Sequence, residues 1–189
     1  MKTVLVTGGI GSGKSEVCRY LLMKGYPVYD CDSRVKALYD EVPGLWNYIC
    51  AKFEIRTRAE LAQRLFSDAG AREQLEAVVY PVLKDDFLEW RDSRNAGLVF
   101  MESAVAAQKP SFDGVADFVL FVDAPLQDRL ARACRRDNAD EEKIRARMDA
   151  QSPDPSGADF IIMNDSDLHS LREKVDEAVK ILKTENNEN

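Results

Sequence analysis

A glycine-rich segment near the beginning of the chain, residues 8–15, contains the residues best suited to chemistry. Its sequence is GGIGSGKS, which satisfies the pattern GxxxxGK[ST], with an apolar β-branched run before it and a helical pattern after it. Glycines let a backbone turn so that successive N–H groups point into one concavity, and a helix that begins near Gly13 adds the positive end of its dipole. We therefore expect a phosphate-binding loop formed by Gly9, Gly11, Ser12, Gly13, Lys14 and Ser15.

The end of this segment supplies the charged and metal-binding groups of the predicted loop. Lys14 would place its ammonium group against the β- and γ-phosphates of a nucleotide, and the Ser15 hydroxyl would bind Mg²⁺. The next residue, Glu16, allows two interpretations. Its carboxylate could lie beside the nucleotide, where it would repel phosphate, or it could turn outward and complement the helix dipole.

Two aspartates follow the second apolar strand, in the sequence YDCD. Ligands of open α/β sheets bind beyond the carboxyl ends of the strands, which is also where the glycine loop lies. If the chain stays extended, Asp30 and Asp32 point the same way, and one of them could accept the proton of an attacking hydroxyl. The alternative is that both cap the helix that begins near Ser33. The spacing alone leaves both possibilities open.

Four arginines lie close together in the helix predicted over residues 125–136: Arg129, Arg132, Arg135 and Arg136. Arginines can neutralise the charge on a phosphoryl group in transfer, and Arg136 is the one predicted to be catalytic. The alternative is a solvated helix face whose arginines pair with neighbouring acidic residues.

Two acidic residues end other predicted strands. Glu102 follows the strand over residues 97–102, where its carboxylate could order a water molecule bound to Mg²⁺ or could cap the turn. Asp123 ends the strand over residues 117–123, and the simpler interpretation is that it is the N-cap of the helix that follows.

Composition excludes several classes of protein. The 189 residues carry a formal net charge of −7, which disfavours a general nucleic-acid binder, so an anion must be held by local geometry. The four cysteines form no CxxC pair and there is one histidine, which excludes a zinc ribbon or finger. We find no signal-peptide pattern and no apolar stretch of ~18 residues, and therefore expect a cytoplasmic protein with reduced thiols and no membrane partner.

Short apolar strands alternate with helical patterns along the chain. Strands are predicted over residues 2–7, 27–30, 97–102, 117–123 and 160–163. Helices are predicted over residues 15–24, 33–53 with an interruption at Pro43-Gly44, 59–94 with breaks at Gly70 and Pro81, 125–136, 140–151 and 168–183. This alternation predicts an α/β fold with a five-stranded parallel sheet covered on both faces. The long helical stretch before the third strand is expected to be an insertion beside the sheet.

The ordered set of motifs resembles the dephospho-CoA kinases. The resemblance rests on TGGIGSGKS, a strand that ends in Asp-x-Asp, RAELAQRLFSD, LEAVVYP, the later RRD, a helix end at Gln151 and ADFIIMND, and it extends over nearly the whole chain. It implies ATP- and Mg²⁺-dependent phosphorylation of the 3′-hydroxyl of dephospho-CoA, the last step of CoA synthesis.

The resemblance also implies an organisation of the chain. A P-loop kinase core is expected over residues 1–32 and 96–189, with a lid over about 136–157, and a helical acceptor-binding domain over residues 33–95. The expected partner is dephospho-CoA and not a nucleic acid, and the chain is expected to be a monomer or a weak homo-oligomer.

Individual roles follow from the positions that match the family motifs. Lys14 and Ser15 take the phosphate and metal roles, and Asp32 is the catalytic base. The remaining matches are Arg58 and Phe66 in the acceptor domain, Arg136 with Asp137 at the lid, and Asn164 near the adenine end of the ATP site. Lys36 is also a predicted substrate-binding residue and stands where the family often has arginine.

The chain differs from the family pattern around the predicted acceptor site. Tyr80 stands where the family usually has histidine, and Val105-Ala106-Ala107-Gln108 replaces Leu-Leu-Phe-Glu. The segment from residue 151 to residue 158 is shorter than usual and lacks basic residues. Tyr80 and Gln108 remain predicted substrate-binding residues. These differences leave two alternatives open: a kinase for another small hydroxyl acceptor such as a nucleoside, or a nucleotide-binding relative with impaired catalysis.

Overall fold

The computed structural model of the chain describes residues 1–151 and 153–187. The fold consists of two compact units, one made of Met1–Asp30 with Arg94–Asn189 and the other of Cys31–Ser93. Each unit has its own set of helices, and the chain enters the second unit directly from the end of a strand of the first.

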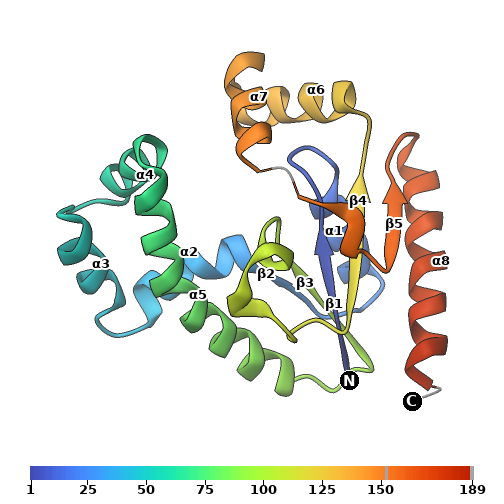
Figure 1. Cartoon of the computed structure of the whole chain (residues 1–189). Helices are drawn as coiled ribbons and strands as arrows, with labels where there is room; N and C mark the ends of the chain where they lie inside the picture. Colours follow the sequence, from blue (N-terminus) through green and yellow to red (C-terminus); the bar gives the residue numbers. More distant parts are fainter. Residues whose placement is uncertain (152, 188–189) are drawn as a thin grey trace. The chain divides into compact units, whose positions relative to one another are not determined.

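The first unit is built on a five-stranded sheet. Its strands are β1 (Lys2–Thr7), β2 (Val28–Asp30), β3 (Leu98–Glu102), β4 (Phe118–Asp123) and β5 (Phe160–Met163). They pair in the order β2-β3-β1-β4-β5, and every neighbouring pair is parallel. The predicted five-stranded parallel sheet is therefore confirmed, with strand ends that differ from the predicted ones by no more than one residue. All carboxyl ends of these strands meet at one edge, where the glycine loop follows β1 (Figure 1).

The described residues of this unit form four α-helices: α1 (Lys14–Met23), α6 (Leu126–Asp137), α7 (Glu141–Ala150) and α8 (Leu168–Asn187). Three short 3₁₀ turns accompany them: η1 (Ala106–Gln108), η2 (Pro110–Phe112) and η3 (Pro155–Gly157). Figure 1 shows α8 running beside β5, and α6 and α7 together beyond the end of β4.

The main core of this unit lies between one face of the sheet and the helices α1 and α8. Alternate strand residues point to this face because side chains along a strand alternate in direction. Val4 and Phe100 are fully buried there, packed with Leu21 of α1 and Leu182 of α8. A second, smaller core joins α6 to α7 and takes in one residue of the glycine loop, Ile10.

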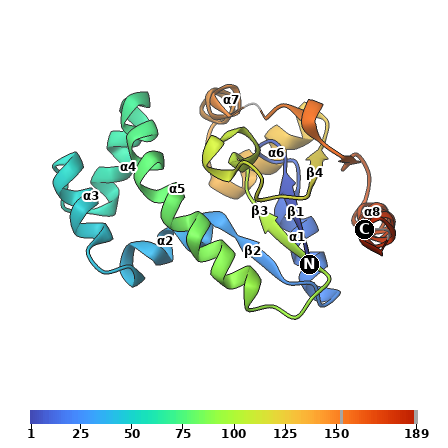
Figure 2. The same cartoon turned by 60° about the horizontal axis from the view of Figure 1, so that its bottom comes forward.

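The second unit is helical. It contains α2 (Cys31–Glu41), α3 (Leu45–Phe53), α4 (Arg58–Ser67) and α5 (Ala69–Asp92). Figure 2 shows α3 and α4 gathered at one end of the long helix α5. Thr57 begins α4 as its N-cap, because its hydroxyl accepts a hydrogen bond from the backbone of Glu60 at 3.2 Å.

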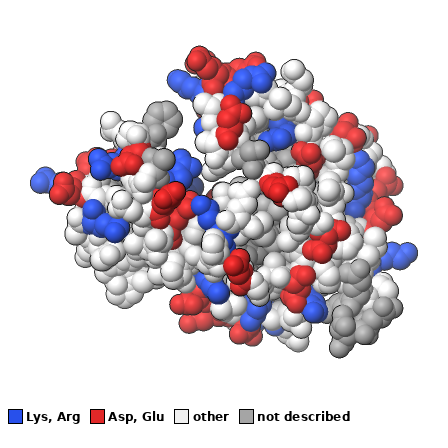
Figure 3. All heavy atoms as spheres, viewed as in Figure 1, with Lys and Arg blue, Asp and Glu red and all other residues white. Residues whose placement is uncertain are grey.

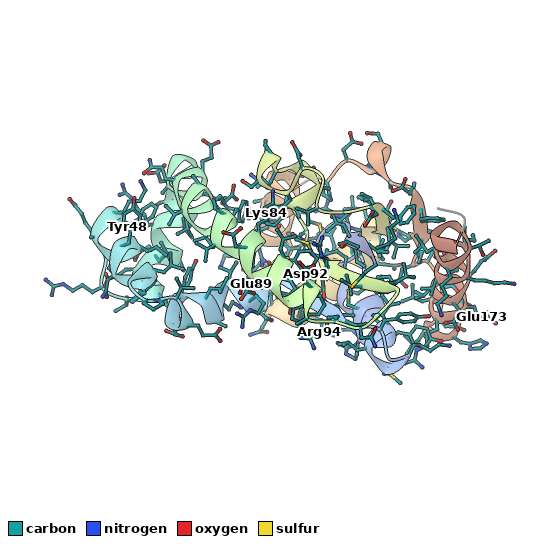
Figure 4. All side chains as sticks on the ribbon, turned by 90° about the horizontal axis from the view of Figure 1, so that it is seen from below. Tyr48, Lys84, Glu89, Asp92, Arg94 and Glu173 are labelled. Atoms are coloured by element: carbon teal, nitrogen blue, oxygen red, sulfur yellow. The ribbon has the colours of Figure 1, made fainter. Side chains whose placement is uncertain are left out.

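The break predicted at Gly70 lies two residues earlier, at Asp68 between α4 and α5, and the break predicted at Pro81 is wrong, because α5 is continuous from Ala69 through Pro81. Gly70 lies in the first turn, where a helix tolerates glycine, and Pro81 removes one interior hydrogen bond without ending the helix. A stripe of buried side chains at every fourth position compensates for that loss: Ala71, Leu75, Val79, Leu83 and Phe87. Figure 4 shows the polar residues Lys84, Glu89 and Asp92 along the same helix. The packing of these buried side chains thus outweighs the tendency of Pro81 to end the helix.

No helix in the described part of the chain is long and apolar enough to cross a membrane.

Truncation of Phe100 tests the main core. Phe100 is completely buried and its ring meets Tyr26 edge to face, with centroids 5.5 Å apart. We expect Phe100→Ala to lower the free energy of unfolding by about 3–5 kcal/mol, because it removes buried apolar surface and leaves a cavity. Urea denaturation measures the change. Ile161→Ala on β5 is the control, since Ile161 is 58% exposed, and a comparable loss in both variants would contradict the assignment of the core.

Candidate active site

The glycine loop between β1 and α1 turns through conformations that only glycine adopts easily. Gly8, Gly11 and Gly13 have φ angles of 143°, 76° and 106°. The loop closes on itself through a hydrogen bond of 3.2 Å from the Ser12 N–H to the carbonyl of Gly9. Gly13 then serves as the N-cap of α1, so the first N–H groups of that helix remain available to a ligand.

Arg129, in the first turn of α6, holds one side of the loop. Its Nε donates to the carbonyl of Ile10 at 3.0 Å, and its side chain is only 18% exposed. A Cβ atom at Gly9 would overlap the Arg129 guanidinium, and one at Gly11 would overlap the Arg129 carbonyl. Gly11 is therefore needed both for its backbone angles and for close contact with the backbone of α6, whereas at Gly9 the contact is with the Arg129 side chain alone.

Asn164, directly after β5, holds the other side of the loop. Its Nδ2 donates to the carbonyl of Ser12 at 2.8 Å, and its own backbone N–H donates to the carbonyl of Asp123 at 2.7 Å. A Cβ at Gly13 would overlap this amide. The structure thus gives Asn164 a contact with the loop backbone, while the predicted contact with adenine stays a prediction.

Ile10 anchors the tip of the loop by apolar packing. It is 8% exposed and lies in a cluster with Leu130 and Ala133 of α6 and with Ile144 and Met148 of α7. Three contacts therefore fix the loop: the Arg129 side chain on one side, the Asn164 side chain on the other, and the buried side chain of Ile10 at the tip.

These contacts leave a small cavity of about 170 Å³ over the loop. Its walls are Gly11, Gly13, Lys14, Ser15, Arg132, Ala133 and Arg136. The Lys14 ammonium group donates to the carbonyl of Gly8 at 2.7 Å and to that of Gly9 at 3.0 Å. The structure therefore brings four of the predicted loop residues and Arg136 around a single space, with Arg132 as an additional cation.

The Ser15 hydroxyl lies between this cavity and the end of β3. It donates to Glu102 Oε1 at 2.7 Å, so its lone pairs remain available to a cation. Glu102 pairs in register with Asp30 on β2. Among the described residues no group of three or more His, Cys, Asp or Glu side chains is arranged to hold a metal. A hard cation with few protein ligands, whose remaining ligands come from phosphate and water, fits this donor set.

Cys18 is a buried neighbour of the Glu102 carboxylate. Burial, and after it the negative charge of Glu102, raises the pKa of the Cys18 thiol well above its ordinary value. The thiol is therefore neutral at physiological pH and is not a nucleophile.

Arg136 is paired with the next residue in the chain. Its Nε and Nη2 donate to the two carboxylate oxygens of Asp137 at 2.6 and 3.0 Å, and Arg147 of α7 adds a third contact at 2.6 Å. The Arg136 guanidinium, followed by Arg147, lowers the pKa of Asp137 to about 2. Figure 3 shows basic and acidic side chains mixed over α6 and α7. Much of the positive charge on these helices is thus neutralised locally.

Glu16 lies in the first turn of α1, and its carboxylate pairs with Arg19 and, at 3.8 Å, with Arg172 of α8. This pairing matches the outward orientation considered for Glu16, with its negative charge at the positive end of the helix.

Asp32 lies in the second unit, in the first turn of α2. The extended conformation that would point Asp30 and Asp32 the same way is absent, because β2 ends at Asp30 and α2 begins at Cys31. Tyr80 of α5 is its neighbour. Burial, then Glu76 and then Asp32 raise the pKa of the Tyr80 hydroxyl, which is therefore a neutral hydrogen-bond donor. Two of the predicted acceptor residues thus lie close together.

The other predicted acceptor residues are dispersed. Arg58 donates to Asp40 at 2.6 Å and lies over the rings of Tyr39 and Trp46, with its Cζ 5.4 and 5.5 Å from their centroids. Lys36 is exposed on α2. The side chain of Phe66 lies outside the described part of the structure.

Gln108 is exposed in η1, in the first unit. It borders a separate cavity of about 380 Å³, whose lining includes Leu5, Met101 and Phe112. Ala106 and Ala107 are part of the same lining, and both are smaller than the leucine and phenylalanine of the family pattern at these positions.

Two functional contacts escaped the sequence analysis. Arg129 and Arg132 were recognised only as members of an arginine-rich helix, whereas the structure places Arg129 on the loop backbone and Arg132 in the cavity wall. Their spacing of three residues puts both on one helix face, but the same spacing relates Arg132 to Arg135, so the spacing alone does not single out the pair. That spacing is a signal that sequence alone contains, but the face that meets the loop depends on how α6 packs.

Comparisons with known proteins identify close relatives. A family model described as Dephospho-CoA kinase matches residues 2–170. The dephospho-CoA kinase of Porphyromonas gingivalis is 38% identical over 195 residues, which cover 97% of this chain and 94% of the relative. The crystal structure of TT1252 from Thermus thermophilus has a TM-score of 0.83 and 31% identity, covering 95% of this chain and 96% of that one. The structure of a dephospho-CoA kinase from Campylobacter jejuni, with a TM-score of 0.68, 22% identity and coverage of 97% and 98%, shows the same fold.

Replacement of Gly13 tests the role of the loop. We expect Gly13→Ala to weaken ATP binding by at least about 10-fold, because alanine at a φ of 106° is strained and its Cβ would displace the Asn164 amide. Isothermal titration calorimetry with ATP and MgCl₂ measures the loss. Gly44→Ala is the matched control, since its φ of 80° is also positive and no atom lies within 4 Å of its added Cβ. Equal affinity in Gly13→Ala and the wild type would contradict the role given to the loop.

Proposed function

Because the chain belongs to the dephospho-CoA kinase family, we propose that it transfers the γ-phosphoryl group of ATP to the 3′-hydroxyl of dephospho-CoA and releases CoA and ADP. The observation that carries the proposal is the cavity over the glycine loop. There the amino end of α1, Lys14, Ser15 and two arginines surround one space. This arrangement suits a triphosphate because backbone dipoles and cations converge where its negative charge would lie.

The proposed reaction needs few groups from the protein. The 3′-oxygen of the acceptor attacks the γ-phosphorus, the bond from that phosphorus to the β,γ-bridging oxygen breaks, and ADP leaves. Asp32 accepts the proton of the attacking hydroxyl. Lys14 and the loop amides stabilise the charge on the phosphoryl oxygens. Arg136 contributes to the same stabilisation once its guanidinium leaves Asp137.

Mg²⁺ belongs to the proposal as the metal of the site. Ser15 would bind it through the hydroxyl oxygen, and Glu102 would orient that hydroxyl and hold a metal-bound water. When bound, Mg²⁺ neutralises charge on the β- and γ-phosphates.

We assign acceptor binding to the helical unit Cys31–Ser93 and a lid role to residues 136–157 of the other unit. Within the helical unit, Asp32 supports the acceptor assignment because its carboxylate can accept a hydrogen bond, and the Tyr80 hydroxyl, which is hydrogen-bonded to Glu76, lies near it. Arg58 offers a guanidinium fixed between two aromatic rings and Asp40. Lys36 and Phe66 remain assigned to the acceptor by resemblance.

The proposed setting is a reducing compartment, the cytoplasm. Cys18, Cys31, Cys50 and Cys134 are all free thiols in the structure. We propose a monomer or weak homo-oligomer without nucleic-acid partners, in keeping with the net charge of −7.

A second class of acceptor remains an alternative, because Tyr80 and Gln108 differ from the family pattern at the predicted acceptor site. A kinase for a nucleoside or another small hydroxyl compound would use the same loop with a different acceptor pocket. Parallel incubations of the protein with ATP, MgCl₂ and either dephospho-CoA or a panel of nucleosides separate the two proposals, with CoA detected by mass spectrometry and ADP release measured in each. We expect CoA and ADP in equal amounts. ADP formed only with nucleosides would favour the second class, and no ADP with any acceptor would favour an impaired relative.

The base is tested by Asp32→Asn. We expect kcat for CoA formation to fall by about 10²- to 10⁴-fold, because the asparagine amide cannot accept the proton. The affinity for ATP should change little, because Asp32 has no proposed contact with the phosphates. Steady-state kinetics and calorimetry give the two values. Asp85→Asn on α5, an exposed aspartate of the same unit, is the control. Parallel losses of turnover and ATP affinity would exclude Asp32 as the base.

A further inference from the structure

Glu16 is the third residue of α1 and stands three positions after the N-cap, Gly13. At this position of a helix, a glutamate side chain often turns back and accepts a hydrogen bond from a backbone N–H at the helix start. In α1 the corresponding N–H groups belong to the glycine loop, where the proposed phosphates lie. A carboxylate bound there would repel a phosphate and would occupy N–H groups that the phosphate needs.

Helix α4 shows this behaviour in the same chain. Its N-cap is Thr57, and Glu60 stands three positions later. The Glu60 carboxylate accepts a hydrogen bond of 2.7 Å from the backbone N–H of Arg56, immediately before the N-cap. Glu16 has the same position in α1, so its carboxylate would bind the backbone of the glycine loop unless other groups held it elsewhere.

Two arginines hold the Glu16 carboxylate elsewhere. It pairs with Arg19, one turn along α1, and its Oε1 lies 3.8 Å from Nη2 of Arg172 on α8. The Arg19 side chain is 63% exposed and belongs to the same helix as Glu16, whereas Arg172 is half-buried on a separate helix. Arg172 is therefore the partner that can fix the direction of the carboxylate.

Arg172 is itself held in place by its neighbours. Its Cζ lies 5.2 Å from the centre of the Tyr20 ring, a distance typical of a cation–π contact. The Tyr20 hydroxyl donates to Asp176 of α8 at 2.7 Å, which ties this ring to both helices. In the described part of the chain, Arg172 Nε is buried without a hydrogen-bond partner and Glu16 is the acidic group paired with Arg172. The guanidinium thus has a fixed position and one counter-charge.

We propose that Arg172 is a positioning residue for nucleotide binding. It holds the Glu16 carboxylate away from the amino end of α1 and so keeps the N–H groups of the glycine loop available to phosphate. Arg172 does not line the cavity over the loop, and its effect is transmitted through Glu16. The proposal deepens the proposed function and rests on it only for the identity of the nucleotide as ATP.

The test is a double-mutant cycle, with ATP affinity measured by calorimetry in MgCl₂. We expect Arg172→Gln to weaken ATP binding about 3- to 10-fold, because the released carboxylate opposes the anion at the helix start. In a chain that also carries Glu16→Ala, the same substitution should change the affinity by less than about twofold. Arg172→Lys keeps the charge and should restore most of the affinity.

The control is Lys180→Gln, which removes the same charge from an exposed position of α8, about two turns beyond Arg172. It should bind ATP like the wild type. Equal losses from Arg172→Gln with and without Glu16→Ala would overturn the proposal, because Arg172 would then act only through packing. Weaker ATP binding by Glu16→Ala alone would also overturn it. If Arg172→Gln does not fold, Arg172→Met, which keeps an unbranched side chain over Tyr20, is judged by the same criteria.

The amide resonance of Gly13 gives a second readout that needs no nucleotide. In spectra of the ¹⁵N-labelled protein, we expect this resonance to move in Arg172→Gln and to return to its wild-type position when Glu16→Ala is added. An unchanged resonance in Arg172→Gln would contradict the proposal. If the wild type bound no ATP, the proposed function would fail, whereas these spectra would still decide whether Arg172 positions Glu16.

Discussion

The rest of the site depends on the hydrogen bonds that neighbouring elements make to the carbonyl groups of the glycine loop. The Arg129 side chain binds the Ile10 carbonyl, and the Asn164 amide binds the Ser12 carbonyl. With the carbonyls engaged on the outside, the N–H groups at the start of α1 are left to face the cavity. The affinity for a polyanion thus comes from the orientation of these backbone N–H groups. This orientation explains how a chain with a net charge of −7 can bind a polyanion.

The sheet makes these hydrogen bonds possible because it brings three chain segments to one edge. β1, β4 and β5 are adjacent and parallel, so the loop after β1, the start of α6 after β4 and Asn164 after β5 all follow carboxyl ends of neighbouring strands. The buried face against α1 and α8 fixes the strands, and Ile10 extends a second core from the loop into α6 and α7. Stability and nucleotide binding therefore share the same contacts at this edge.

Much of this could be predicted from the sequence, because the relevant signals are local. Apolar β-branched runs gave the five strands, and the spacing of Gly, Lys and Ser gave the loop. Predictions that depended on packing were weaker. Pro81 does not end α5, because buried side chains on both sides of it hold the helix together, and Asp32 lies in a helix rather than in an extended segment. The contacts of Arg129 and Arg132 depend on which face of α6 meets the loop, which no local pattern specifies.

The central claim, that the backbone of the loop binds the phosphates, is tested most directly by nuclear magnetic resonance of the ¹⁵N-labelled protein. Inorganic tripolyphosphate with MgCl₂ is added, so that no base or sugar contributes to the response. The account predicts large, saturable shifts of the amide resonances of Gly11, Gly13, Lys14 and Ser15, with the helices of the other unit unaffected. Shifts confined to other segments, or none at concentrations at which ATP binds, would contradict it.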